Sequence, residues 1–111
     1  MIYKLFRAAE MAELAAAGAT RGAPVDRADG YVHLSTAAQV AETAARHFAR
    51  EDGLWLLACD EAAMGNAIRW EPSRGGQLFP HLYRALGRAD VVWARPLALG
   101  TGGHVFPDDL R

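Results

Sequence analysis

The chain has 111 residues, of which 51% are hydrophobic and 23% charged, a composition that suits one globular domain with disorder confined to its ends. Twelve Lys and Arg against 13 Asp and Glu give a formal net charge of −1, so no overall field attracts nucleic acid or an anionic membrane. A single cysteine excludes an intrachain disulfide, and no apolar run approaches the ~20 residues that cross a bilayer, so we expect a soluble cytoplasmic protein.

Two regular elements are predicted in the first twenty residues. Residues 2–6 (IYKLF) form a short run of large apolar side chains, which favours a strand with Lys4 on the same face as its neighbours two positions away. Residues 8–17 are strong helix formers, and Gly18 follows them where a glycine commonly ends a helix. Residues 19–29 contain glycine and proline and lead into an Asp-Gly pair, so we expect a loop there.

The middle of the chain is predicted to hold a strand, a helix and a second strand. Residues 31–35 alternate between polar and apolar side chains, so His33 and Ser35 share one face of a strand. Residues 36–50 begin with the capping-box pattern TAAQ, which predicts a helix directly after that strand. Residues 54–59 are continuously apolar, as is typical of a central strand covered on both faces.

The remaining third mixes strand and loop signals. Residues 67–71 alternate again, with Arg69 and Glu71 on one face of a predicted strand. Residues 72–83 contain prolines and glycines and are expected to form a packed loop. Residues 91–97 predict a last strand interrupted by its proline, and the glycine-rich tail predicts an edge or a loose end. Because strands and helices mix without strict alternation, the predicted fold is a single α+β domain.

The polar face of residues 31–35 is the first candidate site. His33 can donate to a ligand and accept from it, and Ser35 and Thr36 lie beside it at a predicted helix N-terminus, where free amides attract phosphate. We favour this interpretation over a core histidine that bonds to the following loop. For Thr36, helix capping alone is a sufficient explanation.

A second candidate site combines Arg69, Glu71 and Arg74. A guanidinium matches pairs of phosphate oxygens and a carboxylate accepts from ribose hydroxyls, so the segment suits a phosphorylated or ribose-bearing ligand. An internal ion pair between Arg69 and Glu71 explains the pattern equally well. His81 and Tyr83 form an aromatic wall around a base or nicotinamide ring in one interpretation, and pack an irregular loop onto the core in the other.

Several familiar signatures are missing from the sequence. Neither the GxGxxG fingerprint nor the GxxxxGK[ST] phosphate loop is present, which argues against a Rossmann fold and a P-loop enzyme. The chain also lacks the HExxH, CxxC and HxH spacings, so no metal is expected. Cys59 ends an apolar run, where a thiol usually packs and does not react.

Three motifs spread over nearly the whole chain carry a family resemblance: IYKL at residues 2–5, DGYVHLST at residues 29–36 and RWEPSRGGQLFPHLY at residues 69–83. Together they resemble a family of small bacterial proteins catalogued as domain of unknown function 952. The fold of that family is similar to the ADP-ribosyltransferase fold, which implies a split sheet with flanking helices around an NAD cleft. VHLS at residues 32–35 also resembles a strand motif of RNA 2′-phosphotransferases, which share that fold and use NAD to remove a phosphate from RNA.

The resemblance implies a role for each candidate residue. His33 and Ser35 would position the ribose of NAD. Lys4 stands where the phosphotransferases place a histidine, and its flexible ammonium suits phosphate better than ribose. Glu71 is the best stand-in for the acid that stabilises the positive charge developing on the ribose. The two polar segments, residues 29–36 and 69–83, would then be opposite walls of the cleft.

Three functions are compatible with these expectations. The first is an NAD-dependent ADP-ribosyl or phosphate transferase, in which His81 or Tyr83 stacks on nicotinamide. The second is a non-catalytic module that holds a nucleotide or another phosphorylated small molecule through Lys4, His33 and the two arginines of the second site. The third is a protein-interaction domain without a ligand. RNA is a further partner that the net charge of −1 does not support.

Overall fold

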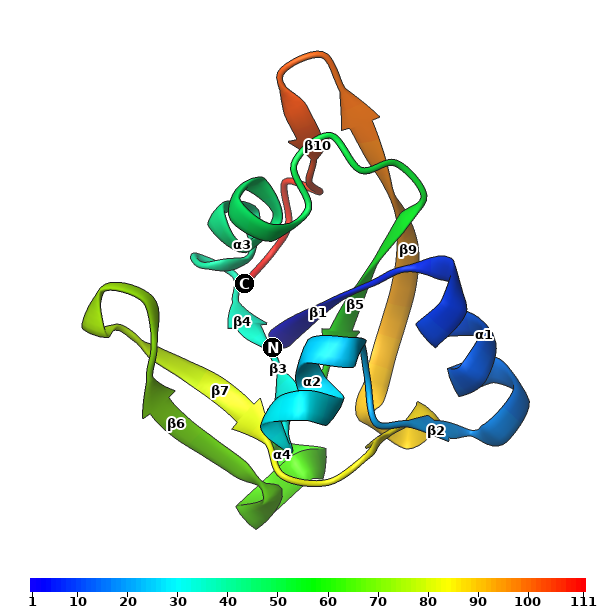
Figure 1. The fold of residues 1–111 in the computed structure, drawn as a ribbon, viewed down its shortest axis with the longest axis vertical. Helices are drawn as coiled ribbons and strands as arrows, with labels where there is room; N and C mark the ends of the chain where they lie inside the picture. Colours follow the sequence, from blue (N-terminus) through cyan, green and yellow to red (C-terminus); the bar gives the residue numbers. More distant parts are fainter.

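The structure is a computed structural model that describes residues 1–111 apart from the side chain of residue 74. A five-stranded sheet lies beside a three-stranded sheet, with helices around both (Figure 1). The helices are α1 (Ala8–Ala17), α2 (Pro24–Asp29), α3 (Val40–His47) and α4 (Glu61–Met64), with 3-10 turns at Gly65–Ala67, Arg74–Gly76 and Arg88–Asp90. The strands are β1 (Ile2–Phe6), β2 (Ala19–Thr20), β3 (Val32–His33), β4 (Ser35–Thr36), β5 (Leu54–Cys59), β6 (Ile68–Pro72), β7 (Leu78–Leu82), β8 (Leu86–Gly87), β9 (Val91–Gly100) and β10 (Gly103–Val105). The fold is α+β, as predicted.

The five-stranded sheet has the order β10-β9-β5-β1-β4, and its described pairs are antiparallel. β5 is central, which confirms the prediction from its apolar run. The expected interruption of the last strand at Pro96 is wrong, because β9 continues through Pro96 to Gly100. β5 pairs with Pro96 on one side, while β10 covers β9 only from Ala98 to Gly100. Proline is tolerated at such an uncovered edge because it lacks only the N–H.

The three-stranded sheet has the order β3-β7-β6. β7 occupies part of residues 72–83, so the prediction of a packed loop there is wrong. Gly75 and Gly76 take left-handed φ angles of 68° and 80° and turn the chain between β6 and β7. The carbonyl of Pro80 accepts from the N–H of Leu34 at 3.0 Å, so the proline still takes part in backbone bonding. Pairing with both neighbouring strands stabilises β7 despite its proline.

The predicted helix at residues 8–17 is confirmed, and Gly18 ends it at a φ of 78°. The prediction of a loop over residues 19–29 is wrong, because β2 and α2 lie there. Pro24 occupies the first turn of α2, where its missing N–H costs nothing. The Asp26 carboxylate accepts from the N–H of Ala23 at 2.8 Å, and Gly30 ends the helix at a φ of 85°. The residues that suggested a loop are therefore the boundaries of a short helix.

The predicted helix over residues 36–50 is too long, since α3 begins at Val40 and ends at His47. The Gln39 side chain accepts from the N–H of Thr36 at 3.0 Å, which is one half of the expected capping box. That bond holds a turn ahead of the helix. The helix ends before Arg50, whose φ of 61° is left-handed.

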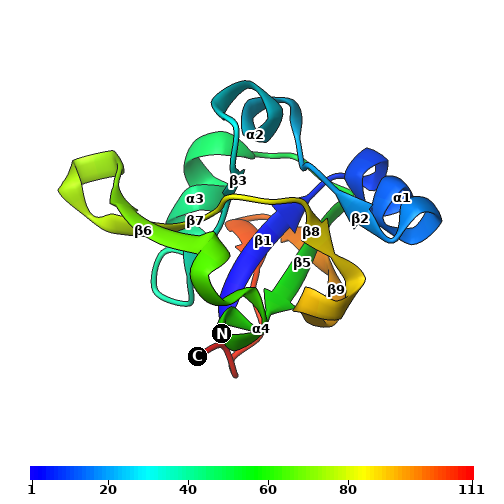
Figure 2. The same ribbon diagram turned by 90° about the horizontal axis from the view of Figure 1, so that it is seen from below.

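Two apolar clusters pack on opposite faces of β1 and β5. Ile2, Phe6 and Leu57 belong to the cluster that also contains Leu14 of α1 and Leu82 of β7. The other cluster joins the opposite face to α3 and to the last residues of the chain; its buried members are Tyr3, Leu5, Val40, Ala44, Leu54, Leu56, Ala58 and Leu97. Figure 2 shows α3 and α1 lying on different sides of β1. Alternation along β1, as predicted, places Lys4 on the face of Ile2 and Phe6.

Candidate functional site

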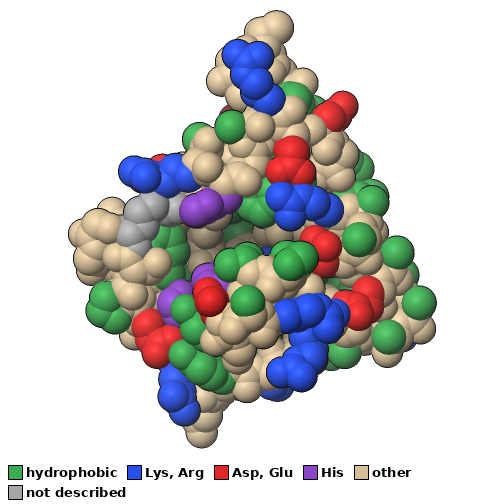
Figure 3. All heavy atoms as spheres, viewed as in Figure 1, with side chains coloured by type: hydrophobic (Ala, Val, Ile, Leu, Met, Phe, Trp, Pro, Cys, Tyr) green, Lys and Arg blue, Asp and Glu red, His purple; other side chains and the backbone are tan. Residues whose placement is uncertain are grey.

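The two sheets part where the chain crosses from one to the other. β3 pairs with β7, whereas β4, which begins two residues later, pairs with Ile2 and Tyr3 of β1. Strand pairing with β4 stops before Lys4, so the remaining edge of β1 faces a cavity of about 940 Å³. The space-filling view shows a hollow at this place with histidine side chains around it (Figure 3). This volume lies within the range of small-molecule and cofactor sites.

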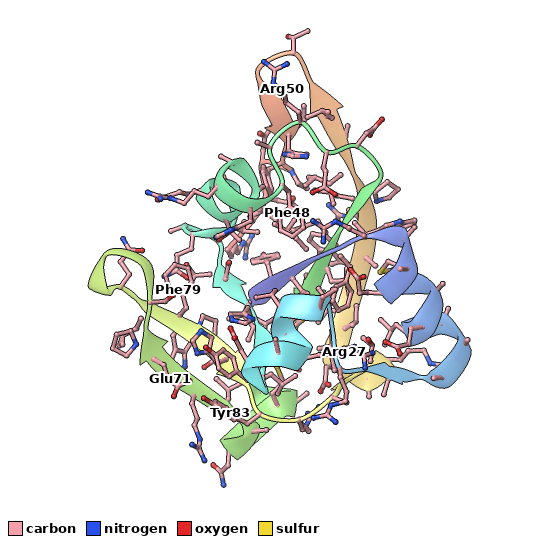
Figure 4. All side chains as sticks on the ribbon, in the orientation of Figure 1. Arg27, Phe48, Arg50, Glu71, Phe79 and Tyr83 are labelled. Atoms are coloured by element: carbon pink, nitrogen blue, oxygen red, sulfur yellow. The ribbon has the colours of Figure 1, made fainter. Side chains whose placement is uncertain are left out.

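The lining of this cavity is cationic. Basic and histidine side chains of the wall come from β1, its following loop, β3, α3 and β7; they are Lys4, Arg7, His33, Arg46, His47 and His81. Among the described residues, the wall includes no Asp or Glu. Apolar contacts come from Leu5, Leu34, Phe48 and Phe79, the last two of which are labelled in Figure 4. The composition suits an anionic ligand that also has flat or apolar parts.

Behind the wall, Asp26 of α2 binds two cavity residues at once. Its carboxylate lies 2.9 Å from Nζ of Lys4 and accepts from the backbone N–H of His33 at 2.9 Å. Its Oδ1 is also 2.6 Å from Nδ1 of His33. Burial acts to raise the pKa of Asp26, but the hydrogen bonds of His33 and the charge of Lys4 outweigh it and lower the pKa to about 2. Asp26 is therefore a buried carboxylate that fixes β1 and β3 to α2.

Lys4 is buried and paired with Asp26. Its ammonium group contacts both oxygens of Asp26 and donates hydrogen bonds to Oδ1 of that carboxylate at 3.1 Å and to the carbonyl of His33 at 2.8 Å. Burial is the main influence on its pKa and lowers it, against the attraction of Asp26. In this arrangement, Lys4 holds the wall of the cavity together, and Asp26 balances its charge.

His33 has a carboxylate beside each ring nitrogen. Nδ1 meets Asp26, and Nε2 lies 2.9 Å from Oδ2 of Asp29 at the end of α2. The contact with Asp26 is a hydrogen bond, and that with Asp29 is an ion-pair contact on the exposed side of the ring. His33 is therefore held in place by α2 through both of its ring nitrogens.

His81 lies directly opposite His33 in the β3–β7 pairing, with ring centroids 5.4 Å apart. Its Nδ1 is 2.8 Å from Oε1 of Glu71 on β6, and the Tyr83 hydroxyl donates to the same oxygen at 2.7 Å. The bond from Tyr83, followed by that from His81, lowers the pKa of Glu71, and the same bond to Glu71 raises the pKa of Tyr83. Tyr31 stacks on His81 at 4.2 Å. Figure 4 shows Glu71 and Tyr83 on this side of the molecule.

The structure brings together part of the predicted site. Of the predicted ligand-binding residues, Lys4, His33, Ser35 and His81 line the cavity. The two polar segments lie side by side as β3 and β7 of one sheet, so the expectation that they are opposite walls of a cleft is wrong. The wall that faces them is built from β1 and α3.

The other predicted residues lie elsewhere. Thr36 does not line the cavity, and its backbone N–H donates to the side chain of Gln39. The Arg69 guanidinium lies 4.6 Å from the Tyr83 ring centroid, and Glu71 reaches the cavity only through His81. Arg74 was also predicted, and its side chain lies outside the described part of the structure. The roles of these residues toward a ligand stay predictions.

Sequence reasoning missed Asp26 and the cavity residues of α3. Asp26 lies in the segment expected to be a loop, although a Pro-x-Asp sequence before a glycine is a recognisable signal for a short capped helix. Arg46 and His47 lie in the last turn of α3, where basic residues are common for reasons of helix stability. Their position beside β1 depends on tertiary packing, so the sequence carried no signal for it.

Cys59 is buried, and burial, helped by the negative charge of Asp90, raises the pKa of its thiol to about 12. This agrees with the expectation that the thiol packs in the core. In the described part of the chain, no group of three or more His, Cys, Asp or Glu is placed to hold a metal ion. No described helix is long and apolar enough to cross a membrane.

The fold and the site define a small α+β protein with a cationic cavity at the split between two antiparallel sheets. The chain belongs to the family described as Protein of unknown function (DUF952), whose model matches residues 5–94. It is similar to protein CC0527 from Caulobacter crescentus, a structural genomics target, whose X-ray structure is 43% identical, covers 93% of this chain and 90% of that chain, and has a TM-score of 0.88. The solution NMR structure of CC0527 covers 93% of this chain and 89% of that chain with a TM-score of 0.82. No curated protein matches the sequence.

Proposed function

We propose that the protein binds a phosphorylated nucleotide, with NAD as the first candidate, in the cavity between β1, β3, β7 and α3. The observation that carries the proposal is the wall, in which Lys, Arg and His side chains gather and no described Asp or Glu takes part. Phosphate groups are the anions that such donors bind best in proteins. The volume of about 940 Å³ leaves room for a base and a ribose beside the phosphates.

The wall retains donors for a ligand even though its cations have partners. Arg7 uses Nε and Nη2 to bind Glu51, so its five N–H groups are only partly engaged. Arg46 binds Glu42 through Nε. Neither carboxylate lines the cavity, so both hold the guanidinium groups in place from outside the wall. Ser35 adds a hydroxyl, which pairs with that of Thr43 at 3.0 Å.

The family resemblance supports NAD over other nucleotides, since a split sheet around an NAD cleft is the arrangement that it implies. Lys4, His33 and Ser35, which the resemblance assigns to that cleft, all line the cavity. In this proposal, the two phosphates of NAD would face the Lys, Arg and His side chains, and the flat rings would lie near Phe79 and Phe48, whose ring already contacts Arg7. NAD would then be held by residues of β1, β3, α3 and β7.

An NAD-dependent transfer reaction is a second candidate function, and the pairing of Glu71 with His81 favours it. This contact places a carboxylate one ring away from the cavity. The carboxylate itself is not part of the wall, so direct stabilisation of a positive ribose would need Glu71 to move inward. Binding without turnover therefore has the stronger support.

Thermal shift with NAD, ADP-ribose, ADP and inorganic phosphate tests the binding proposal, because a ligand present at 100 times its Kd adds about 2.7 kcal/mol to the free energy of unfolding. Arg46→Gln should weaken NAD binding by roughly tenfold, the worth of one charged hydrogen bond. Arg88→Gln is the matched control: it removes the same charge from an exposed position where the guanidinium contacts the carbonyl of Ala15, outside the cavity. A flat response to every nucleotide, or equal losses in the two variants, would contradict the proposal.

Release of nicotinamide from NAD separates the two candidate functions. The reaction is followed with the protein alone and with 2′-phosphorylated RNA as acceptor. Release above background that Glu71→Gln abolishes would support transfer. Binding of NAD without release would leave the nucleotide-binding proposal standing and remove the transferase.

A further inference from the structure

One ring nitrogen of His81 has no hydrogen-bond partner in the described part of the structure. The residue is only 3% exposed, and its Nδ1 meets Glu71, but Nε2 takes part in no hydrogen bond among the described residues. Every fully enclosed side-chain nitrogen or oxygen in the described part of the chain has a partner. Nε2 is therefore not enclosed, and the space that His81 borders is the central cavity.

The contact with Glu71 determines whether Nε2 of His81 donates or accepts a hydrogen bond. Two donors, the Tyr83 hydroxyl and the His81 ring, meet Oε1 of Glu71 and lower the pKa of the carboxyl group, which keeps it an acceptor. Nδ1 of His81 must then carry a proton in order to donate. With Nδ1 protonated, Nε2 of the neutral ring has a lone pair and can only accept a hydrogen bond.

This property distinguishes His81 from His33. Both nitrogens of His33 meet carboxylates, Asp26 on one side and Asp29 on the other. The neighbouring Lys4 is likewise paired with Asp26. In this part of the wall, Lys4 and His33 are thus held by carboxylates, whereas Nε2 of His81 is open to a ligand. The edge-to-face contact with His33 at 5.4 Å and the stacked ring of Tyr31 at 4.2 Å fix the plane of His81.

We propose that Nε2 of His81 accepts a hydrogen bond from a ribose hydroxyl of the bound ligand, so that the cavity discriminates against a nucleotide that lacks this hydroxyl. The inference rests on the proposed nucleotide binding. In a nucleotide, the ribose carries hydroxyl groups and is attached to the phosphates. His81 lines the same cavity as the Lys and Arg side chains proposed to bind the phosphates. A ligand that lacks the hydroxyl offers Nε2 no donor, and sites that hydrogen-bond a substrate hydroxyl discriminate against analogues without it.

Dissociation constants for ADP, 2′-deoxy-ADP and 3′-deoxy-ADP, measured with the wild type and with His81→Phe, test the proposal. Phenylalanine keeps an aromatic ring against Tyr31 and removes the acceptor. The wild type should bind one of the two deoxy analogues about tenfold more weakly than ADP. His81→Phe should bind ADP and that analogue with equal affinity. Equal wild-type affinity for all three nucleotides would overturn the assignment and leave nucleotide binding intact. Discrimination that survives in His81→Phe would also overturn it, and a failure of all three to bind would remove both proposals.

The tautomer of His81 in the ligand-free protein gives a test that does not depend on a folded His81→Phe variant. Nitrogen-15 NMR at about pH 8.5, where imidazoles of ordinary pKa are neutral, should find the proton of His81 on Nδ1. Glu71→Gln, which can donate as well as accept, should increase the fraction with the proton on Nε2. Glu61→Gln is the control, since Glu61 accepts only from Trp70 at 3.3 Å. A wild-type ring with its proton on Nε2 would contradict the proposal.

Discussion

The contacts of Asp26 lead to a large and specific prediction about stability. Asp26→Asn keeps the shape of the side chain but removes the charge that compensates the buried ammonium of Lys4. The lowering of the Asp26 pKa from 3.8 to about 2 corresponds to about 2.4 kcal/mol of stabilisation at neutral pH. Leaving the partner charge buried and unpaired brings the expected loss to about 3–5 kcal/mol. Asp29→Asn, which alters a half-exposed carboxylate on the same histidine, should cost less than about 1 kcal/mol.

Urea denaturation at pH 7 measures both losses. The pH dependence has a definite sign: because folding lowers the pKa of Asp26, its stabilisation is complete above the unfolded value of 3.8 and is lost as the pH falls through about 2. The difference in the free energy of unfolding between the wild type and Asp26→Asn should become smaller as the pH falls from 3.8 to about 2. In a Lys4→Met background, Asp26→Asn should cost at least about 1 kcal/mol less, since no ammonium is left unpaired. Equal losses for Asp26→Asn and Asp29→Asn would refute the reasoning.

Two further predictions concern stability and reactivity. Gly22 has a φ of 93°, and a methyl group there would overlap the Asp26 carboxylate. Gly22→Ala should therefore lower the free energy of unfolding clearly more than Gly53→Ala, for which the left-handed backbone alone predicts a loss of about 1–2 kcal/mol. Equal urea midpoints for the two variants would contradict this. Burial raises the pKa of Cys59 to about 12, so its reaction with a thiol-specific disulfide reagent at pH 8 should be about a hundredfold or more slower in the native than in the urea-unfolded protein, and comparable rates would contradict the buried position.

The elements with strong local signals could be predicted from the sequence. The helix that ends at Gly18 and the central strand at Leu54–Cys59 both follow from local residue patterns. β7 and α2 could not, because proline and glycine act as breakers in one context and as boundaries in another. Pro80 lies inside a strand that pairs on both sides, and Pro24 begins a helix. Which context applies depends on partners elsewhere in the chain.

The sequence indicated several residues that the structure brings to one cavity, but not the contacts that hold them there. Alternation placed Lys4 and His33 on the correct faces of their strands, and the structure brings His33 and His81 together. The carboxylates that hold these residues come from elements that the sequence left open, Asp26 from α2 and Glu71 from the β6–β7 pairing. Those contacts change the assignment of chemistry: the ring of His33 is held between two acidic groups, while His81 keeps an open nitrogen. The difference between His33 and His81 depends on contacts with residues distant in the sequence, which local sequence patterns do not reveal.

The central claim, that the cavity holds a nucleotide, is tested most directly by titrating the nitrogen-15-labelled protein with NAD and following its backbone amide signals. We predict saturable shifts for residues around the cavity, such as Leu5, His33, Ser35, His47 and His81. Signals from the C-terminal half of α1, which does not line the cavity, should stay in place. Absence of saturable shifts with NAD and ADP, or shifts confined to surfaces away from the cavity, would contradict the claim.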